Sequence, residues 1–175
     1  MIYFQPQDSE KAFVEHAWQL VDETYTDYFE RNEKGIDCPA CNKAYCCVQV
    51  VPSTEAEAML IIDYVKQWPL KKRRELVKKF ASVPNKVNEN YRSLCPFLKN
   101  NLCQIYAVRP MNCRFFHSSN RSICKKGRKA LVMPIFEKLS RMHLEFRQWL
   151  EKHNYRSTVI ALQPWLKDKI GDVLK

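Results

Sequence analysis

Cysteine is the residue type that carries the most evident chemistry in this chain. Eight of the 175 residues are cysteines, and four of them lie within ten residues in the stretch CPACNKAYCC, which begins at residue 38. Cys38 and Cys41 have the two-residue spacing that lets both thiolates of a tight turn face one metal ion. Cys46 and Cys47 are adjacent, so they need a turn before both can bind one small ion. This group predicts one side of a metal centre.

A second group of cysteines follows at wider spacing in loop-like sequence, at Cys95, Cys103, Cys113 and Cys124. It contains no close pair, so the pattern of a common zinc finger does not fit. We expect the chain to fold back and bring the two groups together around zinc or an iron–sulfur centre, since an all-sulfur site suits either one. One site, two sites, and a spare thiol packed in the core all stay open.

Charge and composition narrow the classes of function. The chain has 29 Lys and Arg residues against 19 Asp and Glu residues, which gives a net charge of +10. Only three glycines occur, so neither a phosphate loop nor a dinucleotide fingerprint can be written. No apolar run approaches the roughly 20 residues that span a membrane, and the first residues lack the pattern of a signal peptide. We therefore expect a cytoplasmic protein with reduced cysteines and no membrane partner.

Basic residues gather in two segments that could contact a polyanion. Lysine and arginine bind the phosphates of RNA and DNA. No recognised nucleic-acid module accompanies the charge, and a solvated helix face is the more common explanation. We favour a solvated face with at most weak, sequence-independent binding. The cations are Lys71, Lys72, Arg73, Arg74, Lys78 and Lys79 in the first segment, and Lys125, Lys126, Arg128 and Lys129 in the second.

Apolar periodicity predicts three long helices. The first covers residues 8–31, and the second covers residues 53–68 and begins with a capping box in which Thr54 stands three residues before Glu57. The capping box explains Glu57, although this carboxylate could also approach a metal. The third helix has Pro134 in its first turn. The apolar stripes are Val14, Trp18, Val21, Tyr25 and Tyr28 in the first helix, and Ile135, Leu139, Met142, Phe146 and Trp149 in the third.

Shorter elements complete a mainly α fold class with at most one or two short strands. We expect a basic helix at residues 70–80, a strand at residues 48–52, a strand or extended link at residues 158–162 and a terminal helix that starts at Pro164. The helices would frame a loop-rich, metal-organised centre. We expect a single domain over residues 1–175. Its parts are an N-terminal helix (1–34), a cysteine-cluster region (35–130) and C-terminal helices (131–175).

Two stretches together resemble the YkgJ-like cysteine-cluster family of zinc- or iron-chelating domains. They are CPACNKAYCC and, after a helix that bears a glutamate, CPFLKNNLCQIYAVRPMNCRFF at residues 95–116. The family pattern is C-x-x-C…C-C, followed by C-P-F-L, C-x-I-Y and R-P-x-x-C-R. The second stretch matches this pattern throughout. The first departs from it, because four residues (42–45) stand before the adjacent cysteines where the family usually has two.

The resemblance supports a ligand set and a set of neighbours. Arg109 and Arg114 flank Cys113 and would lower the pKa values of thiols or compensate thiolate charge. The alternative is that they are surface arginines or pair with carboxylates. Tyr106 would donate its hydroxyl to a ligand sulfur, or would belong to the core. The metal ligands expected are Cys38, Cys41, Cys46, Cys47, Cys95, Cys103 and Cys113, with Cys124, which lies outside the motif, as an additional candidate.

The function expected from these features is metal binding, with a role in metal handling, redox chemistry or as an accessory protein. The flagellin lysine-N-methylase carries a similar cysteine motif, so a protein-modifying enzyme is an alternative. A nucleic-acid-binding module with a structural metal is a third hypothesis. We predict no catalytic residue, because neither a serine–histidine–acid arrangement nor a pair of carboxylates on one defined face is found.

Overall fold

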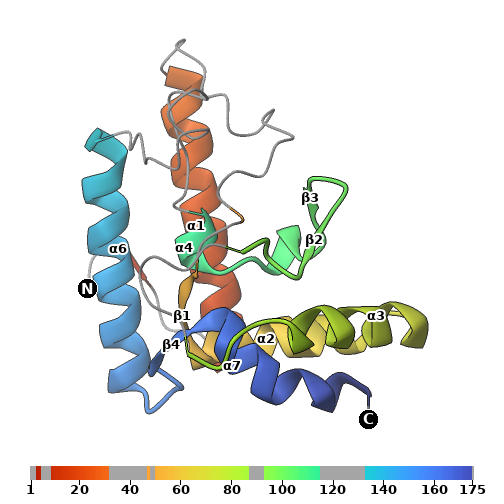
Figure 1. The fold of residues 1–175 in the computed structure, drawn as a ribbon. Helices are drawn as coiled ribbons and strands as arrows, with labels where there is room; N and C mark the ends of the chain where they lie inside the picture. Colours follow the sequence, from red (N-terminus) through yellow and green to blue (C-terminus); the bar gives the residue numbers. More distant parts are fainter. Residues whose placement is uncertain are drawn as a thin grey trace.

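Helices dominate the structure, as the sequence predicts (Figure 1). The structure is a computed structural model that describes residues 3–4, 9–31, 47, 50–86, 93–114 and 133–174. The four strands in these ranges contain only two or three residues each. The elements are α1 (Glu10–Arg31), β1 (Pro52–Thr54), α2 (Glu55–Lys66), α3 (Leu70–Ala81), β2 (Leu98–Lys99), β3 (Leu102–Cys103), η2 (Tyr106–Val108), α4 (Met111–Arg114), α6 (Met133–Lys152), β4 (Val159–Ala161), α7 (Leu162–Lys169) and η3 (Ile170–Leu174).

Two long helices, α1 and α6, run side by side and enclose the first apolar cluster (Figure 1). Their predicted stripes are confirmed, because the described stripe side chains are buried, with the exception of Tyr28, which is half-buried and packs against the cluster. The buried ones are Val14, Trp18, Val21 and Tyr25 of α1 and Leu139, Met142, Phe146 and Trp149 of α6. Phe13 stacks on Trp149 with ring centroids 3.8 Å apart. Burial of such aromatic and aliphatic side chains is the main favourable term that holds the two helices together.

A second apolar cluster lies between α2, α3, α7 and η3, which cross below the first two helices in Figure 1. Helix α2 belongs to both clusters, since Ala56 packs in the first and Ile61, Ile62 and Val65 pack in the second. This shared helix is what fixes the two groups of helices relative to each other.

A small antiparallel sheet also joins the two groups of helices. Strand β1 pairs with β4, with Ser53 opposite Ile160. The strand expected at residues 48–52 is therefore placed too early; residues 48 and 49 lie outside the described ranges, and only Pro52 of the rest is in a strand. Pairing with β4 decides the position, because β-branched sequence alone does not fix where a ladder forms.

Local signals decide where several helices begin and end. The predicted capping box of α2 is present, with the Thr54 side chain accepting from the Glu57 amide and the Glu57 carboxylate accepting from the Thr54 amide. Ser9 caps α1 by accepting a hydrogen bond from the Ala12 amide at 3.1 Å. Helix α7 begins at Leu162, so Pro164 stands inside its first turn rather than at its start. Proline is tolerated there because first-turn amides have no partner within the helix.

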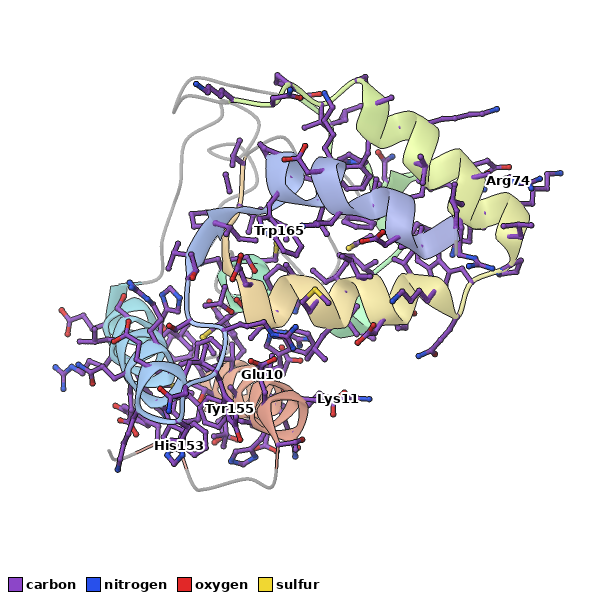
Figure 2. The ribbon with its side chains drawn as sticks, turned by 90° about the horizontal axis from the view of Figure 1, so that it is seen from below. Glu10, Lys11, Arg74, His153, Tyr155 and Trp165 are labelled. Atoms are coloured by element: carbon purple, nitrogen blue, oxygen red, sulfur yellow. The ribbon has the colours of Figure 1, made fainter. Side chains whose placement is uncertain are left out.

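The link from α6 to β4 is held at the N-terminal end of α1. Asn154 has a left-handed φ of 54° and ends α6, while the Tyr155 amide donates to the Leu150 carbonyl at 2.8 Å. The Arg156 amide and Nε then donate to Glu10 at 2.7 and 2.8 Å. Figure 2 shows Glu10 and Tyr155 close together beside α1. The hydrogen bond to Glu10 raises the pKa of Arg156.

Candidate metal centre

Cysteines of both groups fall within the described part of the chain. Cys47 represents the first group, and Cys95, Cys103 and Cys113 represent the second; each is half-buried. The other four cysteines, namely Cys38, Cys41, Cys46 and Cys124, lie outside the described residues.

One cysteine of each group meets the other through the backbone. The amide of Cys95 donates a hydrogen bond to the carbonyl oxygen of Cys47 at 2.6 Å. These residues are far apart in the sequence, so the bond shows that the chain folds back between Cys47 and Cys95. Cys47 therefore lies directly beside the start of the C-P-F-L stretch.

A tight turn and a hairpin carry Cys95 and Cys103. The Leu98 amide donates to the Cys95 carbonyl at 2.9 Å, which closes a turn with Pro96 at its second position. Strand β2 then pairs with β3, with Leu98 opposite Cys103. Asn100 and Asn101 connect the strands with left-handed φ values of 52° and 61°, the backbone of a two-residue type I′ hairpin. The hairpin brings Cys103 back towards the turn that contains Cys95.

Apolar and polar contacts fix this hairpin to the helices. Phe97 and Ile105 are buried in the second apolar cluster, and Cys95 and Cys103 pack against the same cluster. Phe97 meets Phe80 of α3 edge to face at 5.3 Å. Lys79 of α3 donates to the carbonyls of Pro96 and Leu98 at 3.3 and 3.0 Å. Helix α3 therefore positions the hairpin from one side.

Glu57 holds the helical turn that carries Cys113. Cys113 lies in the single turn of α4, whose first amide, that of Met111, donates to Glu57 Oε1 at 2.6 Å. Trp18 of α1 donates its indole N–H to the same oxygen at 3.1 Å. Glu57 Oε2 accepts from the amide and hydroxyl of Thr54 and from the hydroxyl of Ser53.

The Glu57 carboxylate is fully buried, and both of its oxygens are engaged by protein donors. It therefore connects α1, α2 and α4 through hydrogen bonds, which a buried carboxylate requires to offset the loss of water. This arrangement bears out the capping interpretation of Glu57. The sequence did not indicate its bonds to Trp18 and Met111, because they join residues distant in the chain.

Arg114 fastens the segment that leads into α4. Its Nε donates to the Arg109 carbonyl at 2.9 Å, and its Nη2 donates to the Ala107 carbonyl at 2.5 Å. Its Nη1 forms an ion pair with Asp22 of α1, and the guanidinium lies 5.0 Å from the centre of the Trp18 ring. Burial lowers the pKa of Arg114, while the Asp22 carboxylate acts in the opposite direction.

Arg109 shares Asp22 with Arg114. Its Nη2 lies 3.6 Å from Asp22 Oδ1, and its guanidinium stacks 4.0 Å from the centre of the Tyr106 ring. Tyr106 itself is 57% exposed. The structure thus places both arginines in a carboxylate pair with Asp22, the alternative that sequence analysis left open. An effect of these residues on a thiolate stays a prediction.

The described cysteines do not by themselves complete a metal site. Within the described ranges, no group of three or more His, Cys, Asp or Glu side chains could hold a metal ion. What these ranges show is the cysteine frame, the set of contacts that holds the described cysteines: the Cys47–Cys95 backbone bond, the Cys103 hairpin and the α4 turn of Cys113. Their donor chemistry fits zinc or iron, because both bind thiolates.

An open groove of about 590 Å³ lies between α1 and residues 107–114. Carboxylates of α1 line it, including Glu15, Glu23 and Asp27, and Trp18 and Arg114 also border it. Its described lining includes no cysteine.

Within this mainly helical fold, Cys95 and Cys103 lie in a turn and a short hairpin, and Cys113 lies in the turn of α4. The chain belongs to the CxxCxxCC family, described as a "putative zinc- or iron-chelating domain", whose model matches residues 37–141. This range contains all eight cysteines, and it confirms the resemblance drawn from the two cysteine stretches. No curated protein matches the chain, and no solved structure matches it.

Proposed function

We propose that this protein binds zinc or an iron–sulfur centre through both of its cysteine groups. The proposed ligands are Cys38, Cys41, Cys46, Cys47, Cys95, Cys103 and Cys113, with Cys124 as an additional candidate. The observation that carries the proposal is the 2.6 Å hydrogen bond from the Cys95 amide to the Cys47 carbonyl. A backbone bond between one cysteine of each group supports a centre that both groups share.

The frame of the site supports a bound metal that also stabilises the fold. Cys95 and Cys103 lie in a turn and a hairpin with very short strands, where backbone pairing alone contributes little. Metal–thiolate bonds that join such segments contribute binding free energy that is also folding free energy. We infer that the centre organises residues 95–114, while the helices keep their own apolar clusters.

Purification without oxygen followed by elemental analysis tests the proposal. We expect about one equivalent of zinc or iron per chain, or more. The absorption spectrum should distinguish the two metals, because zinc has a filled d shell and lacks the charge-transfer bands that iron gives. Neither metal above ~0.2 per chain, together with eight freely titratable thiols, would contradict it.

The cellular role that we propose is metal handling, redox chemistry or an accessory function in the cytoplasm, where thiols stay reduced. Catalysis such as methyl transfer to a protein would require an exchangeable position at the centre, which turnover with a methyl donor would reveal. We also propose that residues 1–175 form one domain, because α2 contributes to both apolar clusters. In the described ranges, no helix combines the length and apolarity needed to cross a membrane.

A further inference from the structure

Helix α3 presents a stripe of three exposed cations, Lys71, Arg74 and Lys78, hereafter the basic stripe. At 3.6 residues per turn these positions fall within about 60° of the helix circumference and extend over roughly 10 Å. The buried residues Leu76 and Phe80 lie on the opposite side of the helix. Figure 2 shows Arg74 projecting from the outer end of α3, away from the other helices.

The other cations of α3 are engaged within the protein. Arg73 donates to the Val173 carbonyl, Lys72 lies 3.5 Å from the centre of the Trp68 ring, and Lys79 holds the hairpin carbonyls.

The basic stripe differs from these cations, because the ion pairs found among the described residues include none with Lys71, Arg74 or Lys78. Glu75 stands exposed at its flank and is the only acidic residue of the helix. The fold thus keeps three cations in solvent on one line.

We propose that the basic stripe binds the phosphate backbone of double-stranded nucleic acid. A duplex carries one negative charge per about 1.7 Å of its axis, so a line of cations roughly 10 Å long faces several phosphates. Release of condensed counterions supplies the binding free energy, and the net charge of +10 adds long-range attraction. Phosphate contacts carry no sequence information, so the binding is sequence-independent.

The packing of α3 favours nucleic acid over a lipid surface. An amphipathic helix that lies in a membrane interface inserts its apolar face into the acyl boundary. The apolar face of α3 is already buried in the second apolar cluster through Leu76 and Phe80. The surface that remains is the charged one, which suits a ligand that binds through charge alone.

Fluorescence anisotropy across a salt series tests the proposal, with duplex RNA and duplex DNA of about 20 base pairs as ligands. Each duplex is several times longer than the basic stripe. The triple variant Lys71→Ala/Arg74→Ala/Lys78→Ala should bind at least tenfold more weakly at low salt, and the slope of log K against log salt should fall by about 2 to 3. The single variant Arg74→Ala should reduce the slope by about 1.

A matched control separates the basic stripe from net charge. Lys138→Ala/Arg141→Ala/Lys152→Ala removes three exposed cations from α6 and lowers the net charge of +10 by the same three units. This variant should keep nearly the wild-type slope. Equal losses in both triple variants, no binding of either duplex at low salt, or stripe-dependent binding only to phosphatidylserine vesicles would overturn the proposal. Metal content should be unchanged in every variant, so this test is independent of the proposed metal centre.

Discussion

The carboxylate of Glu57 accepts a hydrogen bond from the backbone amide of Met111 at 2.6 Å, across 54 positions of sequence. Met111 opens the turn of α4 that carries Cys113, and Glu57 belongs to the first turn of α2. The position of a proposed metal ligand is therefore tied to a buried cap on another helix. This bond connects the cysteine frame to the helical core without passing through a metal.

Replacement of Glu57 should destabilise the protein more than replacement of an exposed glutamate. Glu57→Ala leaves the Trp18 indole and the Met111 amide buried without an acceptor and removes the capping box of α2. We expect a loss of roughly 3 kcal/mol or more in the free energy of unfolding, measured with urea. Glu75→Ala on the exposed side of α3 is the control and should stay within about 0.5 kcal/mol. A similar small change in both variants would show that the Glu57 bonds contribute nothing net.

The contrast between local and distant contacts explains what the sequence could predict at Glu57. Its capping box joins residues three apart and was visible as a pattern. Its bonds to Trp18 and Met111 join residues 39 and 54 apart, and depend on how α1 and α4 pack. The long helices were predictable for a related reason, since an apolar stripe repeats over many turns and specifies its own buried face.

The elements that the sequence does not predict are mostly short. Strands of two residues and an α4 of four residues are too short to show any periodicity. One signal for the hairpin was available, because asparagine tolerates the left-handed backbone that Asn100 and Asn101 adopt. Lys79 gave no such signal: its role depends on the carbonyls of Pro96 and Leu98 lying beside α3.

Loss of a metal ligand should lower metal content and melting temperature together. Serine replaces a soft thiolate with a hydroxyl that binds zinc and iron poorly, and ligand loss removes part of the folding free energy. We expect this coupled loss for Cys→Ser at Cys38, Cys41, Cys95, Cys103 and Cys113, and at one or both of Cys46 and Cys47.

Elemental analysis and circular dichroism of each cysteine variant provide the measurement. Cys124→Ser serves as the comparison and should have the mildest effect. The far-ultraviolet signal should persist after chelation, because the apolar clusters of the helices pack without metal. Unchanged metal content in all five single variants, from Cys38 to Cys113, would contradict a site built from both groups.

His143 should make stability depend on pH. Burial lowers the pKa of His143, with the charge of Arg147 acting in the same direction and that of Glu57 opposing it. The unfolded chain therefore binds the proton more readily, and stability falls as pH drops below the unfolded value of about 6.5. His143→Gln should show a shallower fall in unfolding free energy between about pH 7.5 and pH 5 than wild type. Parallel curves for the two proteins would exclude this contribution.

Arg114 should be irreplaceable by lysine in holding the segment before Cys113. Its planar guanidinium reaches the carbonyls of Ala107 and Arg109 while Nη1 pairs with Asp22. A lysine ammonium lacks this fork and cannot satisfy all three acceptors at once. We expect Arg114→Lys to lower the free energy of unfolding by about 2 kcal/mol.

The same Arg114→Lys change should speed the transfer of metal to a chelator. The carbonyls of Ala107 and Arg109 that it releases belong to the segment before α4, the turn that carries the proposed ligand Cys113. Arg141→Lys on the exposed side of α6 is the matched control and should leave both quantities unchanged. If Arg114→Lys lowered stability but left the rate of metal transfer at the wild-type value, Arg114 would support the core alone, and Cys113 would be held in place by other contacts.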